Sequence, residues 1–124
     1  MRKYDLEERL IDYAVLIISI VKLLPDNIEG RILGNQLIKS GTSPALNYGE
    51  AQGAESRKDF IHKSSVILKE LRESHVGLRI VKKSNLTRDT NILEKVILET
   101  NELISIFVTG IKTAKKNMIK QKSL

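Results

Sequence analysis

Apolar residues recur along this chain at alternating steps of three and four, the spacing of helices that each bury one face. The four runs cover about residues 5–24, 28–52, 56–84 and 88–119. No stretch shows the strict alternation that is typical of a half-buried strand. Four helices with short connections predict an all-α, up-down-up-down four-helix bundle, a single domain over residues 1–124 that ends in a basic C-terminal tail.

The second helix is expected to bend or break near its middle. Gly41 interrupts the apolar pattern there, and Ser43-Pro44 has the form of a helix N-cap followed by proline at the first helical position. We therefore predict that this helix is kinked or briefly broken near Ser40–Ser43 and resumes through Ala51.

The fourth helix carries more apolar residues than one core-facing row needs. Its main seam runs from Leu93 to Met118. A second row beside it contains Ile92, Val96, Leu103 and Ile106. Burial of this second row against another copy of the chain is one interpretation, and it predicts a homo-oligomer. A wide core-facing stripe inside a monomer explains the same pattern.

Small and polar residues gather between Ser40 and Phe60. Glycine or alanine recurs every four residues at positions 41, 45, 49 and 53, so these residues share a helix face that another backbone can approach closely. A neighbouring face carries the polar row Ser40, Ser43, Asn47 and Glu50. Buried amide and carboxyl groups require hydrogen-bond partners, so we predict that this row is a structural clasp within the bundle or between subunits. A ligand or nucleic-acid contact is the alternative.

The sequence offers little support for metal or catalytic chemistry. It has no cysteine, and neither His62 nor His75 follows a glutamate at the Glu-x-x-His spacing of metal sites in helix bundles. Nucleophile elbows and phosphate-binding loops are also missing from the sequence. We therefore expect no metal, no cofactor and no enzymatic activity.

The net charge of +6 is distributed unevenly. Residues 1–62 hold 8 basic against 9 acidic side chains, a net −1, whereas residues 63–124 hold 13 against 6, a net +7. No acid follows Glu102. Such a surface attracts phosphate backbones or acidic partners, although a solvated lysine tail that only aids solubility is the alternative.

The candidate nucleic-acid-binding residues are Arg79, Lys82, Lys83, Lys112, Lys115, Lys116, Lys120 and Lys122. The first three end the third helix and the others end the fourth, so an up-down bundle places them at opposite poles as two patches. With 4% aromatic residues, recognition is expected to be electrostatic rather than base-specific. The lack of cysteine and of any apolar run near 20 residues predicts a cytoplasmic protein without a membrane partner.

The chain resembles the small bacterial four-helix-bundle family named for 23S rRNA intervening sequences. The specific block reads SGTSPALNYGEAQGAESRKDFIHK and is followed by LKELRE, and the similarity extends from YDLEERLIDYAV to IKTAKKN. The resemblance implies a ring-shaped homopentamer with a nucleic-acid-binding role. The chain is also distantly similar to the accessory variability proteins of diversity-generating retroelements, which implies binding of RNA and a reverse transcriptase.

The family-pattern positions matched here are Ser40, Ser43, Asn47, Glu50, Asp59, Phe60, Glu70 and Glu73. On this ground we add Asp59, Glu70 and Glu73 to the predicted structural clasp. The chain departs from the family at Leu46, where a small residue is usual, and at 75–77, where aromatics are common. Together these features predict a non-enzymatic, oligomeric protein that binds the backbone of RNA or DNA. The alternative is a structural adaptor that assembles with a protein partner without contacting nucleic acid.

Overall fold

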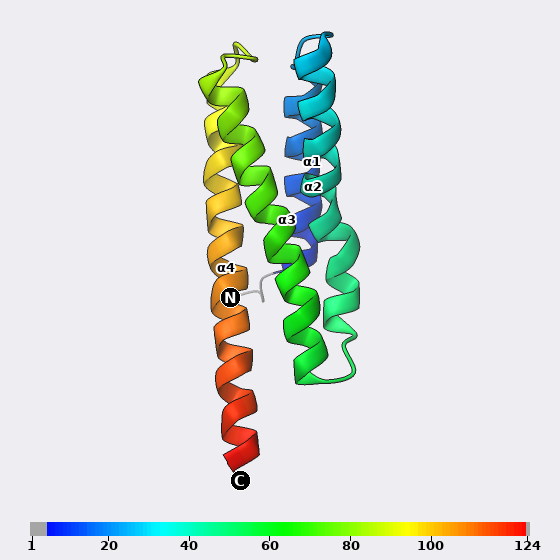
Figure 1. The fold of residues 1–124 in the computed structure, drawn as a ribbon, viewed down its shortest axis with the longest axis vertical. Coiled ribbons are helices and arrows are strands. Elements are labelled where there is room, and N and C mark those ends of the chain that lie inside the picture. Colours follow the sequence, from blue (N-terminus) through cyan, green and yellow to red (C-terminus); the bar gives the residue numbers. More distant parts are fainter. Residues whose placement is uncertain (1–4, 124) are drawn as a thin grey trace.

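Four helices follow one another up and down in the computed structural model, which describes residues 5–123 and side chains as far as Lys120 (Figure 1). They are α1 (Leu6–Lys22), α2 (Ile28–Gln52), α3 (Arg57–Lys83) and α4 (Thr90–Ser123). No strand occurs within residues 5–123. The predicted all-α, up-down-up-down bundle is confirmed.

A polar side chain caps the start of every helix by accepting a hydrogen bond from the backbone N–H three residues later. The capping residues are Asp5, Asn27, Ser56 and Asp89, with N···O distances from 2.8 to 3.2 Å. At the start of α3, Asp59 also accepts from the N–H of Glu55 at 3.3 Å. These caps satisfy backbone donors that have no partner within their own helix, and they fix where each helix begins.

The end of α3 is closed by a left-handed residue. Asn85 has φ 54°, its N–H donates to the carbonyl of Lys82, and the N–H of Leu86 donates to the carbonyl of Val81 at 3.1 Å. This pair of bonds is the Schellman arrangement, which satisfies the last carbonyls of a helix and turns the chain. It directs the chain back into α4.

The second helix is kinked but not broken. It runs continuously from Ile28 to Gln52 with Pro44 buried inside it, so the expected N-cap at Ser43 is wrong. The Ser43 hydroxyl instead accepts a hydrogen bond from Asn47 Nδ2 at 2.9 Å, one turn further along the same helix. Proline has no N–H to donate and its ring crowds the carbonyl four residues earlier, and α2 changes direction at this level (Figure 1).

Both apolar rows of α4 face the core of the same chain. The buried members are Leu93, Val96, Leu103, Phe107, Ile111 and Ala114. Ile92, Ile97, Ile104 and Ile106 are partly buried against them. The wide core-facing stripe therefore accounts for the second row without an oligomer.

Close helix packing depends on two glycines. A Cβ atom at Gly41 would lie 2.6 Å from Cγ1 of Ile17 in α1, and one at Gly77 would lie 2.9 Å from Cδ2 of Leu37 in α2. A Cβ at Gly49 would meet no atom within 4 Å. The close approach expected of this glycine row therefore occurs at Gly41 but not at Gly49.

Candidate functional site

Exposed lysines surround the end of α4, which extends past the end of α2 and the start of α3 (Figure 1). They are Lys112, Lys115, Lys116 and Lys120. Lys112, Lys116 and Lys120 recur every four residues and so follow one side of the helix. None of the four forms an ion pair with a described carboxylate. The side chain of Lys122 lies outside the described residues.

The start of α3 adds two cations that the sequence reasoning missed. Arg57 and Lys58 are exposed, and Arg57 lines the same shallow groove as Thr113 and Asn117 of α4. The signal for them was available, because in an up-down bundle the third helix begins where the fourth one ends. We call the set Arg57, Lys58, Lys112, Lys115, Lys116 and Lys120 the basic pole.

Arg79, Lys82 and Lys83 lie at the opposite end of the bundle, where α3 ends (Figure 1). Lys82 Nζ is 2.7 Å from Oε1 of Glu94, so one of the three charges is already paired. The structure does not bring these three residues to the basic pole. They form a separate and weaker patch.

An ion-pair cluster between α1 and α4 joins Arg9 to Glu99 and Glu102, the last two acids of the sequence. Arg9 donates from Nε and Nη2 to the two oxygens of Glu99, both at 2.7 Å, and its Nη2 lies 2.9 Å from Oε2 of Glu102. These contacts place Glu99 and Glu102 on the side of α4 that faces α1. Beyond Glu102, α4 carries only basic charge.

Each helix contributes one polar side chain to a buried layer at the centre of the bundle. The four residues, which we call the polar layer, are Tyr13, Ser40, Ser74 and Thr100, and each is at most 5% exposed. The hydroxyls of Tyr13 and Thr100 are 2.7 Å apart, and those of Ser40 and Ser74 are 2.8 Å apart. Because Thr100 donates to the carbonyl of Val96, Tyr13 donates to Thr100.

The surroundings of Tyr13 in the polar layer change the pKa of its hydroxyl. Burial raises the pKa of Tyr13 to about 12, and hydrogen bonds with Thr100 and Ser74 oppose part of that rise. Of the four residues, only Ser40 was assigned to the predicted clasp. Tyr13 and Thr100 lie at positions that continue the apolar spacing of their helices. The sequence pattern therefore did not distinguish them from ordinary core residues.

The other predicted clasp residues are dispersed. Ser43 and Asn47 bond to each other within α2, and Glu50 is exposed. Asp59 caps α3 and lies 3.2 Å from Nζ of Lys63. Glu70 and Glu73 line a groove between α2 and α3. The structure does not gather these residues into one cluster.

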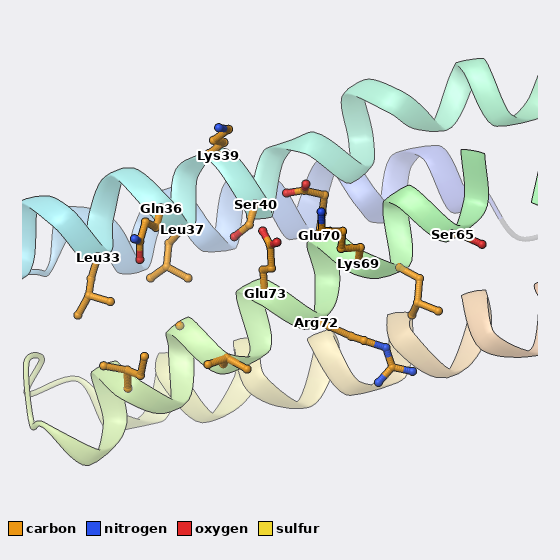
Figure 2. A pocket seen from close by; sticks show the side chains of 14 residues that line it. Leu33, Gln36, Leu37, Lys39, Ser40, Ser65, Lys69, Glu70, Arg72 and Glu73 are labelled. Atoms are coloured by element: carbon orange, nitrogen blue, oxygen red, sulfur yellow. The ribbon is translucent and has the colours of Figure 1, made fainter. Parts of the chain in front are cut away.

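That groove has a volume of about 950 Å³ (Figure 2). Leu33, Leu37, Val76 and Ile80 make one end apolar. Glu70, Glu73 and Lys69 lie between the helices in its middle, whereas Lys39 extends away from α3 (Figure 2). Burial, followed by repulsion from Glu73, raises the pKa of Glu70, and Lys69 and Lys39 oppose this change.

The described residues contain no group of three metal-ligating side chains. The pKa of His75 is lowered by burial and by Arg79, and neither histidine lies in such a group. No helix in the described part of the chain has the length and apolarity needed to cross a membrane.

The fold and its charge distribution define a small four-helix-bundle protein with one strongly basic end. The model of the 23S rRNA-intervening sequence protein family matches residues 2–109, so the chain belongs to this family. A crystal structure of a protein of unknown function from the S23 ribosomal protein family of Bacteroides thetaiotaomicron is similar to it. The two share 28% sequence identity and a TM-score of 0.76, over 87% of this chain and 99% of the other. No curated protein matches.

Proposed function

We propose that this protein is a non-enzymatic, self-associating protein that binds the phosphate backbone of RNA or DNA through its basic pole. One observation carries the proposal. Four exposed lysines surround the projecting end of α4, beyond the last acid of the chain, and none is paired with a described carboxylate. A lysine that is already paired with a carboxylate attracts phosphate less strongly than an unpaired one. These four lysines are therefore expected to contribute more to nucleic-acid binding than Lys82.

The chemistry of the pole fits backbone contact rather than base recognition. Lysine neutralises phosphates and releases their counterions, which gives affinity that falls with salt and does not depend on sequence. The one aromatic residue that lines the groove beside Arg57 is Phe60, which is partly buried against the core, so the pole offers little surface for base stacking. The names of the family and of its structural relative refer to ribosomal RNA and a ribosomal protein family, which makes RNA the first probe to try.

A triple substitution, Lys112→Gln, Lys116→Gln and Lys120→Gln, tests the pole. Binding to a 20-base-pair RNA duplex and to a single strand is measured by fluorescence anisotropy across a salt series. The affinity is expected to fall at least about tenfold at low salt. The slope of log K against log salt should become shallower by roughly 0.9 for each duplex phosphate that the variant no longer neutralises. The lower affinity and the shallower slope are both expected without any loss of helix content.

The matched control is Lys39→Gln, Lys69→Gln and Lys95→Gln, which removes the same charge from exposed positions outside both basic patches. It is expected to retain most of the affinity. Equal reductions in the two triple variants would mean that net charge alone acts, and a wild-type chain that binds neither probe at low salt would overturn the proposal.

Self-association is supported by an apolar strip on the outer side of α1. Ile11, Val15 and Ile18 recur at steps of four and three and are 41%, 56% and 36% exposed. They lie opposite the buried row that contains Leu10 and Ile17. Aliphatic side chains aligned on the solvent side of a short helix favour an interface with another subunit.

Val15→Asp is expected to shift the mass measured by light scattering toward that of one chain, because the interface would then bury an unpaired carboxylate. The family resemblance implies five chains in the wild-type particle. Ser105→Asp, which adds the same charge on the exposed side of α4, should leave the mass unchanged. A wild-type monomer at micromolar concentration would contradict self-association.

A further inference from the structure

The first helix covers only part of the bundle. Among the described residues it begins at Leu6, part-way along α4, and the lower parts of α2, α3 and α4 have no described fourth helix beside them (Figure 1). We call the space on this side of the lower bundle the α1 gap. The residues that form its walls lie on the same sides of α2 and α4 as the residues that contact α1 in the upper part of the bundle.

On α4, Glu99 and Glu102 face α1 through Arg9. Steps of four and three from Glu102 lead to Ile106, Gly110, Thr113 and Asn117, which therefore lie on the same side of the helix. The last three line a groove of about 600 Å³ together with Arg57, Phe60 and Ala114. The groove thus occupies the α1 gap between the start of α3 and the end of α4.

On α2, Gly41 faces α1 through its contact with Ile17, and steps of four lead to Ala45 and Gly49. A Cβ atom at Gly49 would meet no atom within 4 Å, and the same holds for Gly110 on α4. Glycine is unfavourable inside a helix, and no contact in the described structure requires it at these two positions. Both walls of the gap therefore permit close approach by another backbone.

The length of the gap suits a short helix. The rings of Phe107 and Tyr48 meet edge to face. The pKa of Tyr48 is raised mainly by burial and further by Asp5 and Glu7, so Tyr48 lies near the start of α1. The contact between Tyr48 and Phe107 therefore marks the upper end of the gap. From Phe107 to Asn117, α4 rises about 15 Å at roughly 1.5 Å per residue. That is room for a helix of about ten residues, in the place that a longer α1 would fill.

Charge decides what kind of helix fits. Lys116 and Lys120 are exposed and lie one turn or less from Thr113 or Asn117, and Arg57 is one of the residues that line the groove. No acid follows Glu102 on α4, so the end of a second copy's α4 would meet like charge here. Acidic side chains would meet opposite charge on the lysine side of the groove.

We propose that the α1 gap is a docking site for an acidic amphipathic helix of a protein partner. Its apolar side packs on Phe60 and Ala114 between the two open glycines, and its carboxylates face Lys116 and Lys120. This is the helix-in-groove mode, in which apolar anchors at i, i+3, i+4 and i+7 enter a groove and charges at the rim set orientation. The apolar contacts of the groove play no part in the proposed nucleic-acid binding, whereas Lys116 and Lys120 belong to both sites, so peptide and nucleic acid would compete for these two lysines.

An array of synthetic 14-residue peptides supplies the probe, with Leu, Ile or Met at the four anchor positions and Glu or Asp elsewhere. Each peptide is paired with a scrambled version of the same composition. Gly110→Leu fills the groove at a position where a Cβ meets nothing, and Thr109→Leu adds the same side chain on an exposed neighbouring position. Anisotropy reports peptide and RNA binding, light scattering reports the mass of the oligomer, and thermal unfolding reports stability.

We expect amphipathic peptides to bind more tightly than their scrambled versions. Gly110→Leu should weaken this binding at least tenfold, whereas Thr109→Leu should not, and both should bind RNA like the wild type. The proposal is overturned if no peptide exceeds its scramble, or if Gly110→Leu binds peptide normally. It is also overturned if Gly110→Leu instead abolishes RNA binding or lowers the oligomer mass, since nucleic acid or a second copy would then be the occupant.

Discussion

Replacing Tyr13 by alanine is expected to lower the free energy of unfolding by about 3–5 kcal/mol, the range for removing a fully buried aromatic side chain. Tyr13 is 0% exposed and lies among side chains from all four helices. Its removal leaves a cavity and also leaves the buried hydroxyls of Thr100 and Ser74 short of a partner. Urea denaturation followed by circular dichroism measures the decrease.

Tyr13→Phe separates the hydrogen bonds from the packing. It keeps the ring, and Thr100 and Ser74 keep their bonds to Val96 and Ser40, so the expected cost is only about 0.5–1.5 kcal/mol, the net contribution of a typical hydrogen bond. A decrease as large as that of the alanine variant would show that the ring is not the main contribution, and no decrease at all would show that the polar layer does not stabilise the fold.

The wild type and Tyr13→Phe are also expected to differ in how their free energies of unfolding respond to alkaline pH. The pKa of Tyr13 is raised to about 12 in the folded chain, against about 10 when unfolded, so folding favours its neutral form. This contribution is complete below about pH 10 and is lost as pH rises from about 10 through 12. Other groups titrate in this range, so the test is the difference between wild type and Tyr13→Phe, which should shrink across it.

Substitution of Gly41 is expected to have the second largest effect. In Gly41→Leu the new Cβ falls 2.6 and 2.7 Å from the two γ-carbons of Ile17, and Ile17 is 0% exposed and has no space to move into. Separating α1 from α2 is the remaining way to relieve the overlap. Overpacking of this kind costs about 3 kcal/mol, or more where several carbons are added, and it should outweigh the better helix propensity of leucine.

Gly49→Leu is the matched control, because it makes the same change two turns further along the same helix. Its Cβ meets nothing within 4 Å, so only the gain in helix propensity remains, about 1 kcal/mol. The two variants should therefore shift the urea midpoint in opposite directions. A stabilised Gly41→Leu protein would show that the contact between α1 and α2 is looser than the distances indicate.

The four helices could be predicted from the sequence because their apolar residues recur with a period that only helices bury efficiently. Leu10, Ile17, Leu71 and Phe107 belong to the four apolar runs, and all of them are buried. The fate of Pro44 could not be predicted, since proline after serine suits both a helix start and a kink. In the structure Gly41 packs against Ile17 of α1 and Ser40 bonds to Ser74 of α3 just before Pro44, contacts that the sequence pattern alone does not specify.

Part of the candidate site could likewise be predicted from the sequence, and part of it could not. The lysines after Glu102 could be assigned to one pole from helix order alone, and that order also contained the information that places Arg57 beside them. The pairing of Lys82 with Glu94 depends on side-chain reach across two helices, which spacing does not encode. The polar layer was missed because tyrosine and threonine on a seam look like core until their partners are known.

The short first helix divides the bundle into two halves of unequal cooperativity. Above the start of α1, four helices share the polar layer and the Arg9 ion pairs, so opening any one of them breaks contacts with its neighbours. Below it, the ends of α2 and α4 and the start of α3 have fewer helices to pack against, and we therefore expect this region to open locally at a lower free energy. The basic pole and the α1 gap both lie there, in the half whose ordering a bound partner can increase without altering the fold above it.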